Sequence, residues 1–138
     1  ISPGMLARAR RRLARLPHDN YTLEQGEAQD LAAASGDFDL VFNAYMFDLV
    51  PFAEMTPILA EFRRVLKKGG KLVLVNMTRG ERCGSGMFEW LHRRAPKLMG
   101  GCRGVMMADA LVQQGFDVRS RQYLQQMGFP SEVIVARK

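Results

Sequence analysis

The segment that decides the fold is residues 58–78, ILAEFRRVLKKGGKLVLVNMT, where a helical pattern passes directly into a strand pattern. Thr56 and Pro57, just before it, are typical of a helix start, because proline fits the first helical position. Apolar residues then recur at helical spacing, which predicts one buried helix face. The residues of this face are Ile58, Leu59, Phe62, Val65 and Leu66.

Charge and glycine mark the end of this helix. Lys67 and Lys68 suit the negative end of the helix dipole, and Gly69 suits a left-handed C-terminal cap. Residues 71–77, KLVLVNM, then have the pattern of a strand, and residues 36–44, GDFDLVFNA, supply another strand before the helix. The nearly continuous apolar run of the earlier strand is expected when both of its faces are covered. These elements together predict a βαβ unit with parallel strands.

Segments upstream of this unit add one more helix and one more strand. Ser2 and Pro3 are typical of an N-cap and a first helical position, and the helical pattern runs to about Leu16. Residues 21–28, YTLEQGEA, are a short strand candidate.

Segments downstream predict an antiparallel ending. Residues 116–125 and 131–138 have strand patterns and are joined by QMGFP, as in a β-hairpin. A helix closed by Gly115 precedes the hairpin. The expected fold class is therefore α/β. The helix before the hairpin is expected at residues 106–114, and two further elements are expected between the βαβ unit and this helix: a polar, glycine-rich loop at residues 78–86 and a helix at residues 87–94.

Composition places the chain among ordinary globular proteins. Its 138 residues predict a single domain, residues 1–138, and the contents of 47% apolar and 25% charged residues are typical of such a domain. The apolar runs are too short for a transmembrane helix. Cys83 and Cys102 lack the paired spacing of a metal site, and this usage of cysteine favours a reducing, cytoplasmic location.

The formal net charge of +6 is concentrated between Arg8 and Arg15. A solvated helix face explains such a run most simply, with nucleic acid or an anionic membrane as alternatives. Few aromatic residues lie among these arginines, so a stacking platform for single strands is not supported. We therefore expect no specific nucleic-acid partner.

Other motifs are weak. Gly84 and Gly86 lie between a strand and a helix, as in a phosphate-binding loop, but the third glycine is missing and Glu89 stands in its place. His18 and His92 have no metal-ligand spacing, and each is more typical of an ordinary surface histidine.

Three fragments together are more specific: residues 1–10, ISPGMLARAR; residues 26–44, GEAQDLAAASGDFDLVFNA; and residues 58–78. This combination resembles the class I S-adenosylmethionine-dependent methyltransferases. The tail, residues 115–138, is similar to the branch of ubiquinone and menaquinone biosynthesis C-methyltransferases. The resemblance implies a Rossmann-like, mostly parallel sheet with a C-terminal antiparallel hairpin. It also implies S-adenosylmethionine as the cofactor and methyl transfer to a small, apolar or aromatic molecule.

The resemblance also suggests site residues. Adenine needs an apolar slot and a hydrogen-bond acceptor for its amino group, and the sulfonium methyl donor is already reactive, so the protein mainly aligns the reactants and excludes water. A dedicated general base is therefore not always required, and Asp48, Tyr45 and His92 are candidates only. Helix packing is an equal alternative for Met5, as core packing is for Tyr45 and Phe47. The implied cofactor-binding residues are Ile1, Ser2, Met5, Glu27, Ala28, Asn43 and Ala44, and the implied substrate-binding residues are Tyr45, Phe47 and Asn76.

In the similar proteins, the first strand, a glycine-rich turn and the second strand precede the position of Ile1. We therefore expect the chain to be the C-terminal two-thirds of a methyltransferase domain that lacks these two strands. Their absence exposes strand edges, because unpaired backbone groups are costly to bury. Three alternatives remain open: a longer protein, re-pairing of strands within the chain or in a homodimer, and a shortened non-catalytic module. Such a module would act through oligomerisation at an exposed sheet edge or through its basic helix. Enzymatic activity is expected of the intact protein and left open for this chain, as is the atom that accepts the methyl group.

Overall fold

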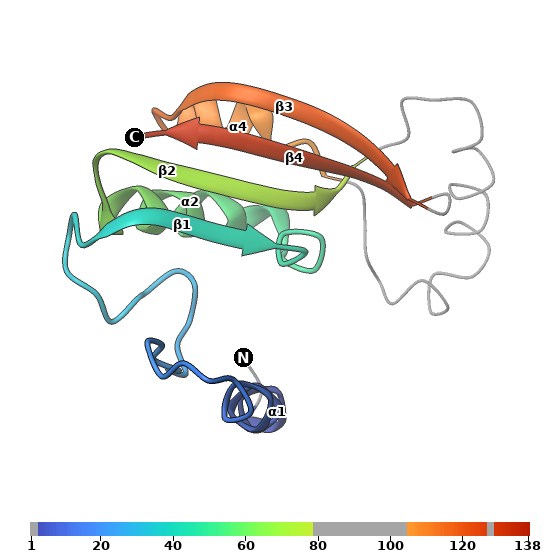
Figure 1. Ribbon diagram of the computed structural model, residues 1–138. Helices are drawn as coiled ribbons and strands as arrows, with labels where there is room; N and C mark the ends of the chain where they lie inside the picture. Colours follow the sequence, from blue (N-terminus) through green and yellow to red (C-terminus); the bar gives the residue numbers. More distant parts are fainter. Residues whose placement is uncertain (1–2, 79–104, 127–128) are drawn as a thin grey trace.

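The computed structural model describes residues 3–78, 105–126 and 129–138, and its centre is one sheet of four strands in the order β1-β2-β4-β3 (Figure 1). The strands are mixed in direction, because β1 and β2 are parallel whereas β4 is antiparallel to both β2 and β3. The elements are α1 (Pro3–Leu13), β1 (Phe38–Ala44), α2 (Phe52–Val65), β2 (Leu66–Met77), α4 (Ala108–Gln113), β3 (Asp117–Gln126) and β4 (Phe129–Arg137).

The predicted βαβ unit is confirmed by β1, α2 and β2, but its helix begins earlier than expected. Pro57 lies inside α2, which starts at Phe52 after the extended Pro51. The expectation that Pro57 occupies the first helical position is therefore wrong. Met55 is 6% exposed and joins the core through the added turn. Burying this side chain offsets the hydrogen bond that Pro57 cannot donate.

The predicted C-terminal hairpin is also confirmed by β3 and β4. The far end of β4 is fastened beside the turn that starts β2. Lys138 N–H donates to the carbonyl of Gly70 at 3.0 Å, and Gly69 N–H donates to the carbonyl of Lys138 at 3.1 Å. Gly69 has a φ of +77°, the left-handed conformation that was expected, but the expectation that it caps the helix is wrong. The helix α2 ends at Val65, and residues 66–70 belong to β2.

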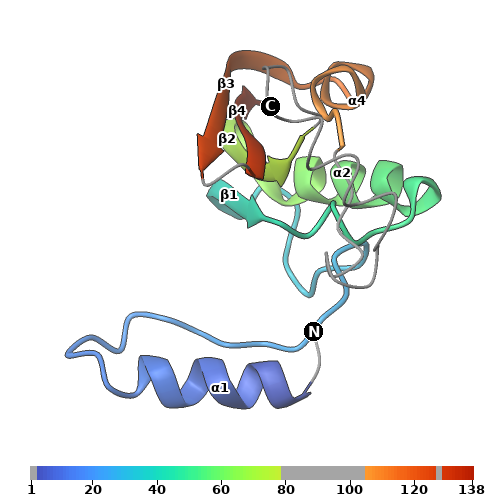
Figure 2. The same cartoon turned by 90° about the vertical axis from the view of Figure 1, so that its right-hand side faces the viewer.

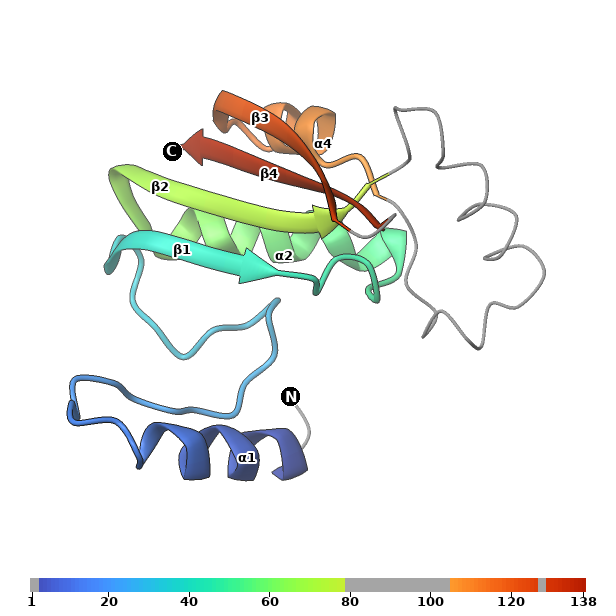
Figure 3. The same cartoon turned by 45° about the vertical axis from the view of Figure 1, so that its right-hand side comes forward.

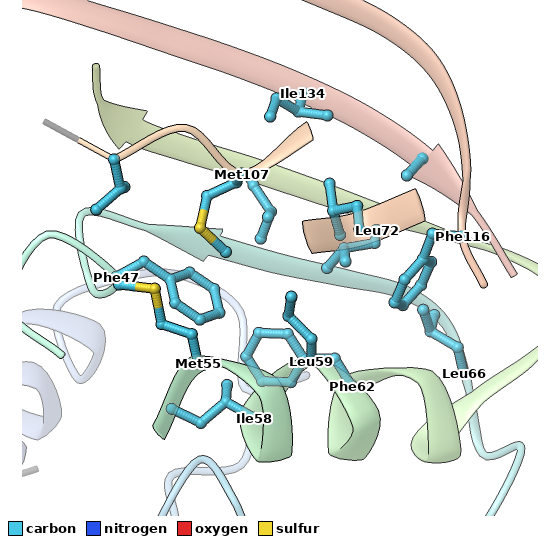
Figure 4. Close-up of a cluster of buried hydrophobic side chains, with 14 residues drawn as sticks. Phe47, Met55, Ile58, Leu59, Phe62, Leu66, Leu72, Met107, Phe116 and Ile134 are labelled. Atoms are coloured by element: carbon cyan, nitrogen blue, oxygen red, sulfur yellow. The ribbon is translucent and has the colours of Figure 1, made fainter. Parts of the chain in front are cut away.

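The core lies on one face of the sheet, beneath α2 and α4, as Figure 2 shows. In Figure 4 side chains of α2 point toward those of the sheet, and Phe47 lies at one end of the cluster. The rings of Phe47 and Phe62 meet edge to face with centroids 6.2 Å apart. Fully buried members include Leu59, Leu72, Leu74, Met107, Leu111 and Ile134.

The opposite face of the sheet carries exposed apolar side chains, which contradicts the expectation that β1 is covered on both sides. Leu40 is 50% exposed and Phe42 is 62% exposed. No helix among the described residues lies on this side (Figure 2). We call this surface the open sheet face. Its residues are Leu40, Phe42, Val73, Val75, Val133 and Val135, which the register of β1, β2 and β4 places side by side.

The strand expected in residues 21–28 is wrong. This segment forms no ladder, and its one β contact is the isolated bridge between Glu27 and Asp30. A strand requires a neighbour for its backbone groups, and no described strand pairs with this segment. The segment instead joins α1, which lies apart from the sheet, to β1 (Figure 3).

Two further expectations have different outcomes. The last predicted helix is confirmed by α4, and Gly115 has a φ of +77° after it. The loop at residues 79–86, the helix at residues 87–94, both cysteines and His92 lie outside the described residues. Among the described residues, no helix is long and apolar enough to cross a membrane.

Candidate functional site

A cavity of about 600 Å³ lies where the chain leaves the carboxyl end of β1. One wall is the cavity loop, which we define as residues 24–35, and the other walls are the turn after β1 and one face of α2. This volume falls in the range typical of small-molecule sites. The lining side chains come from three separate segments: Glu24, Gln25, Glu27, Ala28, Gln29, Leu31 and Ala32 from the loop; Asn43, Met46 and Val50 from the end of β1 and the turn; and Glu54, Ile58 and Phe62 from α2.

The charge of the cavity is opposite to that of the chain. The chain carries a formal net charge of +6, yet the ionisable residues that line the cavity are Glu24, Glu27 and Glu54, all acidic. Ile58 and Phe62 supply apolar surface from α2. Such a lining favours a ligand that combines an apolar ring with positive charge, and it disfavours phosphate groups.

The cavity loop has little regular structure, and an ion pair on α2 holds it. Leu31 N–H donates to Glu61 Oε1 at 2.7 Å, while Arg64 Nη2 donates to the carbonyl of Leu31 at 3.1 Å. Arg64 also binds Glu61 through two nitrogens, each at 2.7 Å from a carboxylate oxygen. These hydrogen bonds from Arg64 lower the pKa of the Glu61 carboxyl to about 2.

The turn after β1 contains a strained residue next to a polar one. Tyr45 has a φ of +54°, which is unusual for a residue with a side chain, and its N–H donates to the carbonyl of Val75 at 2.7 Å. Asn43 Nδ2 contacts the sulfur of Met46 at 3.3 Å, whereas the buried Asn43 Oδ1 has no hydrogen-bond partner among the described residues. Strain and an unsatisfied buried acceptor are both common where a ligand binds.

A second polar group lies beneath the carboxyl end of β2. Asp48, Asn76, Thr78 and Glu132 are each at most 1% exposed. Asp48 Oδ1 accepts the N–H of Met77 at 3.0 Å, and Glu132 Oε2 accepts Nε of Arg121 at 2.6 Å. Burial, with a smaller contribution from the charge of Glu132, raises the pKa of Asp48 to about 6.

The structure brings together some of the expected cofactor-binding residues. Glu27, Ala28 and Asn43 all line the cavity. Ala44 is exposed at the end of β1 and is not among the lining residues. Met5 is 65% exposed on α1 and does not line the cavity either. Ile1 and Ser2 lie outside the described residues.

The expected substrate-binding residues are spread over different environments. Tyr45 is 49% exposed, and its hydroxyl lies 3.4 Å from Ser131 Oγ. Phe47 is fully buried in the core against Phe62. Asn76 is fully buried on the covered face of β2, and both of its side-chain polar atoms lack a hydrogen-bond partner in the part of the chain that the structure describes.

Several lining residues were not singled out from the sequence. Ile58 and Phe62 were assigned only to the buried face of a helix, whereas both residues also line the cavity. Val50 and Glu54 carry no motif at all. Their position at the cavity depends on how the turn after β1 folds back onto α2, and no pattern in the local sequence predicts that folding.

Comparison with known proteins gives these features a context. Residues 1–70 match the family described as "Methyltransferase domain". An uncharacterized methyltransferase of Synechocystis is 36% identical over 78 residues, which cover 56% of this chain and 34% of that protein. The chain therefore spans about a third of the length of this curated relative.

Solved structures share the fold. A SAM-dependent methyltransferase from Methanosarcina mazei has a TM-score of 0.77 at 16% identity, covering 100% of this chain and 79% of that one. Magnesium protoporphyrin IX methyltransferase from Synechocystis, solved with bound SAH, has the same TM-score of 0.77 at 16% identity, covering 100% of this chain and 61% of that one. The fold agrees with the family match, which covers half of the sequence, and the chain belongs to the methyltransferase domain family.

Proposed function

We propose that the protein transfers a methyl group from S-adenosylmethionine to a small, apolar or aromatic molecule. The observation that carries this proposal is the apolar, acidic cavity at the carboxyl end of β1. Ligands of open α/β sheets bind outside the carboxyl ends of the strands, where this cavity lies. The family and its structural neighbours support S-adenosylmethionine as the cofactor.

The residues present fit this cofactor. Ile58 and Phe62 offer apolar surface for the adenine ring, and Glu27 offers a carboxylate acceptor for its amino group. The unsatisfied Oδ1 of Asn43 is a further acceptor at the buried side of the cavity. S-adenosylmethionine carries a sulfonium and an ammonium group, which suit the acidic lining of Glu24, Glu27 and Glu54.

The bound cofactor would supply an activated methyl group, so the protein's task is to orient the acceptor and exclude water. On the acceptor side, Tyr45 is favoured among the three expected residues, because its exposed side chain follows directly after β1. Phe47 and Asn76 lie beneath the surface and are proposed to shape this region from below. Asp48, also buried, remains a proposed proton acceptor rather than an assigned one.

The proposal also assigns the protein to a branch of the family. Residues 115–138 resemble the ubiquinone and menaquinone biosynthesis C-methyltransferases, and this resemblance supports that branch. We propose that residues 1–138 form one domain that continues into a longer cytoplasmic protein, which the coverage of 34% of the curated relative supports. The exposed edge of β1 supports a homodimer as the alternative way of completing the sheet.

A calorimetric titration tests the cofactor assignment. S-adenosylhomocysteine is titrated into the chain, into Glu27→Gln and into the control Asp19→Asn, which changes an exposed carboxylate away from the cavity. We expect saturable heat for the chain and the control, and about tenfold weaker binding for Glu27→Gln, because the amide oxygen still accepts a hydrogen bond but lacks the charge that strengthens it. An absence of heat from the folded chain contradicts cofactor binding by these residues, and equal affinities contradict the role of Glu27.

A further inference from the structure

The cavity loop has few attachments of its own. Within it, the isolated bridge between Glu27 and Asp30 and the hydrogen bond from Ala33 N–H to the Leu31 carbonyl are local turns. Ala28 and Leu31 are half-buried against the core. Such a segment has a low local stability, so its position depends on the contacts that tie it to the rigid part of the fold.

Those contacts converge on two residues of α2. Glu61 accepts the N–H of Leu31 at 2.7 Å, and Arg64 donates to the carbonyl of the same residue at 3.1 Å. Both backbone groups of Leu31 are thus held. Arg64 Nη1 reaches Ser35 Oγ at 3.3 Å, which holds the end of the loop as well.

Glu61 and Arg64 are also bound to each other and to the segment that precedes β1. Glu61 is 9% exposed, and its two oxygens accept three nitrogens of Arg64 and Leu31. The backbone carbonyl of Arg64 accepts Gly36 N–H at 2.9 Å, and the carbonyl of Val65 accepts Asp37 N–H at 2.8 Å, just before β1 begins. The cavity loop is therefore attached to α2 at Leu31 and Ser35, and the segment just after it is attached at Gly36 and Asp37.

The same turns of α2 line the cavity. Ile58 and Phe62 face the cavity, Glu61 lies between these two residues in sequence, and Arg64 follows Phe62 by two residues. We propose that Glu61 and Arg64 are positioning residues that hold the cavity loop where it closes the cofactor site, so that Glu27 and Ala28 face the adenine. The part concerning adenine rests on the proposed function, whereas the attachment of the loop does not.

Two variants and a matched control test this role. Arg64→Met removes the hydrogen bonds to Leu31 and Ser35, and Glu61→Gln is a milder change that keeps an acceptor for the Leu31 N–H. The control Lys67→Met breaks the ion pair between Lys67, at the start of β2, and Asp39 on β1, which are 2.8 Å apart. Neither residue belongs to the cavity loop. Circular dichroism establishes that each protein is folded.

Amide hydrogen exchange measures the attachment of the loop. We expect the Leu31 amide to exchange about tenfold faster in Arg64→Met, as expected when a local opening becomes easier. The amides of β2 are expected to keep their exchange rates in every variant, and the Leu31 amide is expected to keep its rate in the control Lys67→Met. In Glu61→Gln the Leu31 amide should exchange at a rate between those of the unmodified chain and Arg64→Met. Unchanged exchange at Leu31 in both folded variants overturns the proposal, and acceleration across the whole sheet overturns it as well, because the effect would then be global.

Ligand selectivity measures the consequence for the site. We compare the affinities for S-adenosylhomocysteine and for its analogue with inosine in place of adenosine, which lacks the adenine amino group. In Arg64→Met the affinity for S-adenosylhomocysteine is expected to fall about tenfold and its preference over the analogue to shrink. An unchanged preference overturns the proposal. If the wild-type chain binds neither compound, the proposed function fails, and the exchange of Leu31 alone decides whether the two residues hold the loop.

Discussion

The carboxyl group of Asp48 is ionisable and buried, and its surroundings disfavour its charged form. Burial raises the pKa of Asp48 to about 6, the charge of Glu132 adds to this increase, and the N–H of Met77 opposes it. An aspartate in an unfolded chain titrates near ~4. Between these two pKa values the folded protein binds more protons than the unfolded chain, so the free energy of unfolding falls as the pH rises.

Asp48→Asn should therefore stabilise the protein at pH 8 and have little effect at pH 4. The asparagine keeps an acceptor for Met77 N–H and carries no charge, so we expect a gain of about 1–3 kcal/mol at pH 8. Urea unfolding at the two pH values measures it. The exposed Asp19→Asn is the control, and a gain that is equal at both pH values would contradict the role of the buried charge.

At the residue scale, sequence reasoning predicted part of the candidate site. Glu27, Ala28 and Asn43 were expected to act together, and they line one cavity. Val50 and Glu54 were not predicted as lining residues, because their position at the cavity depends on the tertiary folding of a short turn. Met5 matched the family pattern, but its side chain is 65% exposed on α1 and does not line the cavity.

Among the elements, the turn from α2 into β2 is the most constrained. A Cβ added to Gly70 would lie 2.9 Å from the carbonyl oxygen of Lys67 and 3.3 Å from that of Asp39. Backbone atoms of two segments therefore approach Gly70 closely, and neither can move without disturbing the pairing of β1 with β2.

Gly70→Ala is expected to destabilise the fold by about 1–3 kcal/mol, because overpacking forces a backbone shift. Gly4→Ala in α1 is the matched control, since nothing lies within 4 Å of its added Cβ. Urea midpoints compare the two variants. Equal midpoints for Gly70→Ala and the unmodified chain would show that the turn relaxes without cost.

Elements with a strong internal pattern were predicted best. α2, β2 and the β3–β4 hairpin combine periodic apolar residues with clear turn residues, and the structure contains all of them. The strand expected at residues 21–28 failed because a strand is defined by its partner as much as by its own residues. The start of α2 failed because burial of Met55 outweighed the local signal of Pro57.

For the molecule as a whole, the dominant surface feature is the open sheet face. Phe42 is 62% exposed and lies beside Val73 and Val135 in the register of the sheet. One edge of β1, with which no described strand pairs, borders this surface. Exposed apolar surface next to an unpaired strand edge favours association with another chain.

Phe42→Lys should weaken self-association of the chain. Sedimentation velocity over a wide concentration series is expected to show dimer for the unmodified chain and a shift to monomer for Phe42→Lys. Val112→Lys, which changes a side chain that is 60% exposed on α4, should leave the dimer unchanged. A chain that sediments as monomer throughout would contradict the proposed homodimer.

The hydrogen bonds between Lys138 and the turn at Gly69 and Gly70 have a practical consequence for experiments. They place this residue at the amino end of β2, whereas the cavity lies past the carboxyl end of the parallel neighbour β1. A linker joined to Lys138 would leave from the opposite rim of the sheet. A protein captured on a sensor surface through such a linker would therefore keep its cavity accessible to small ligands in solution.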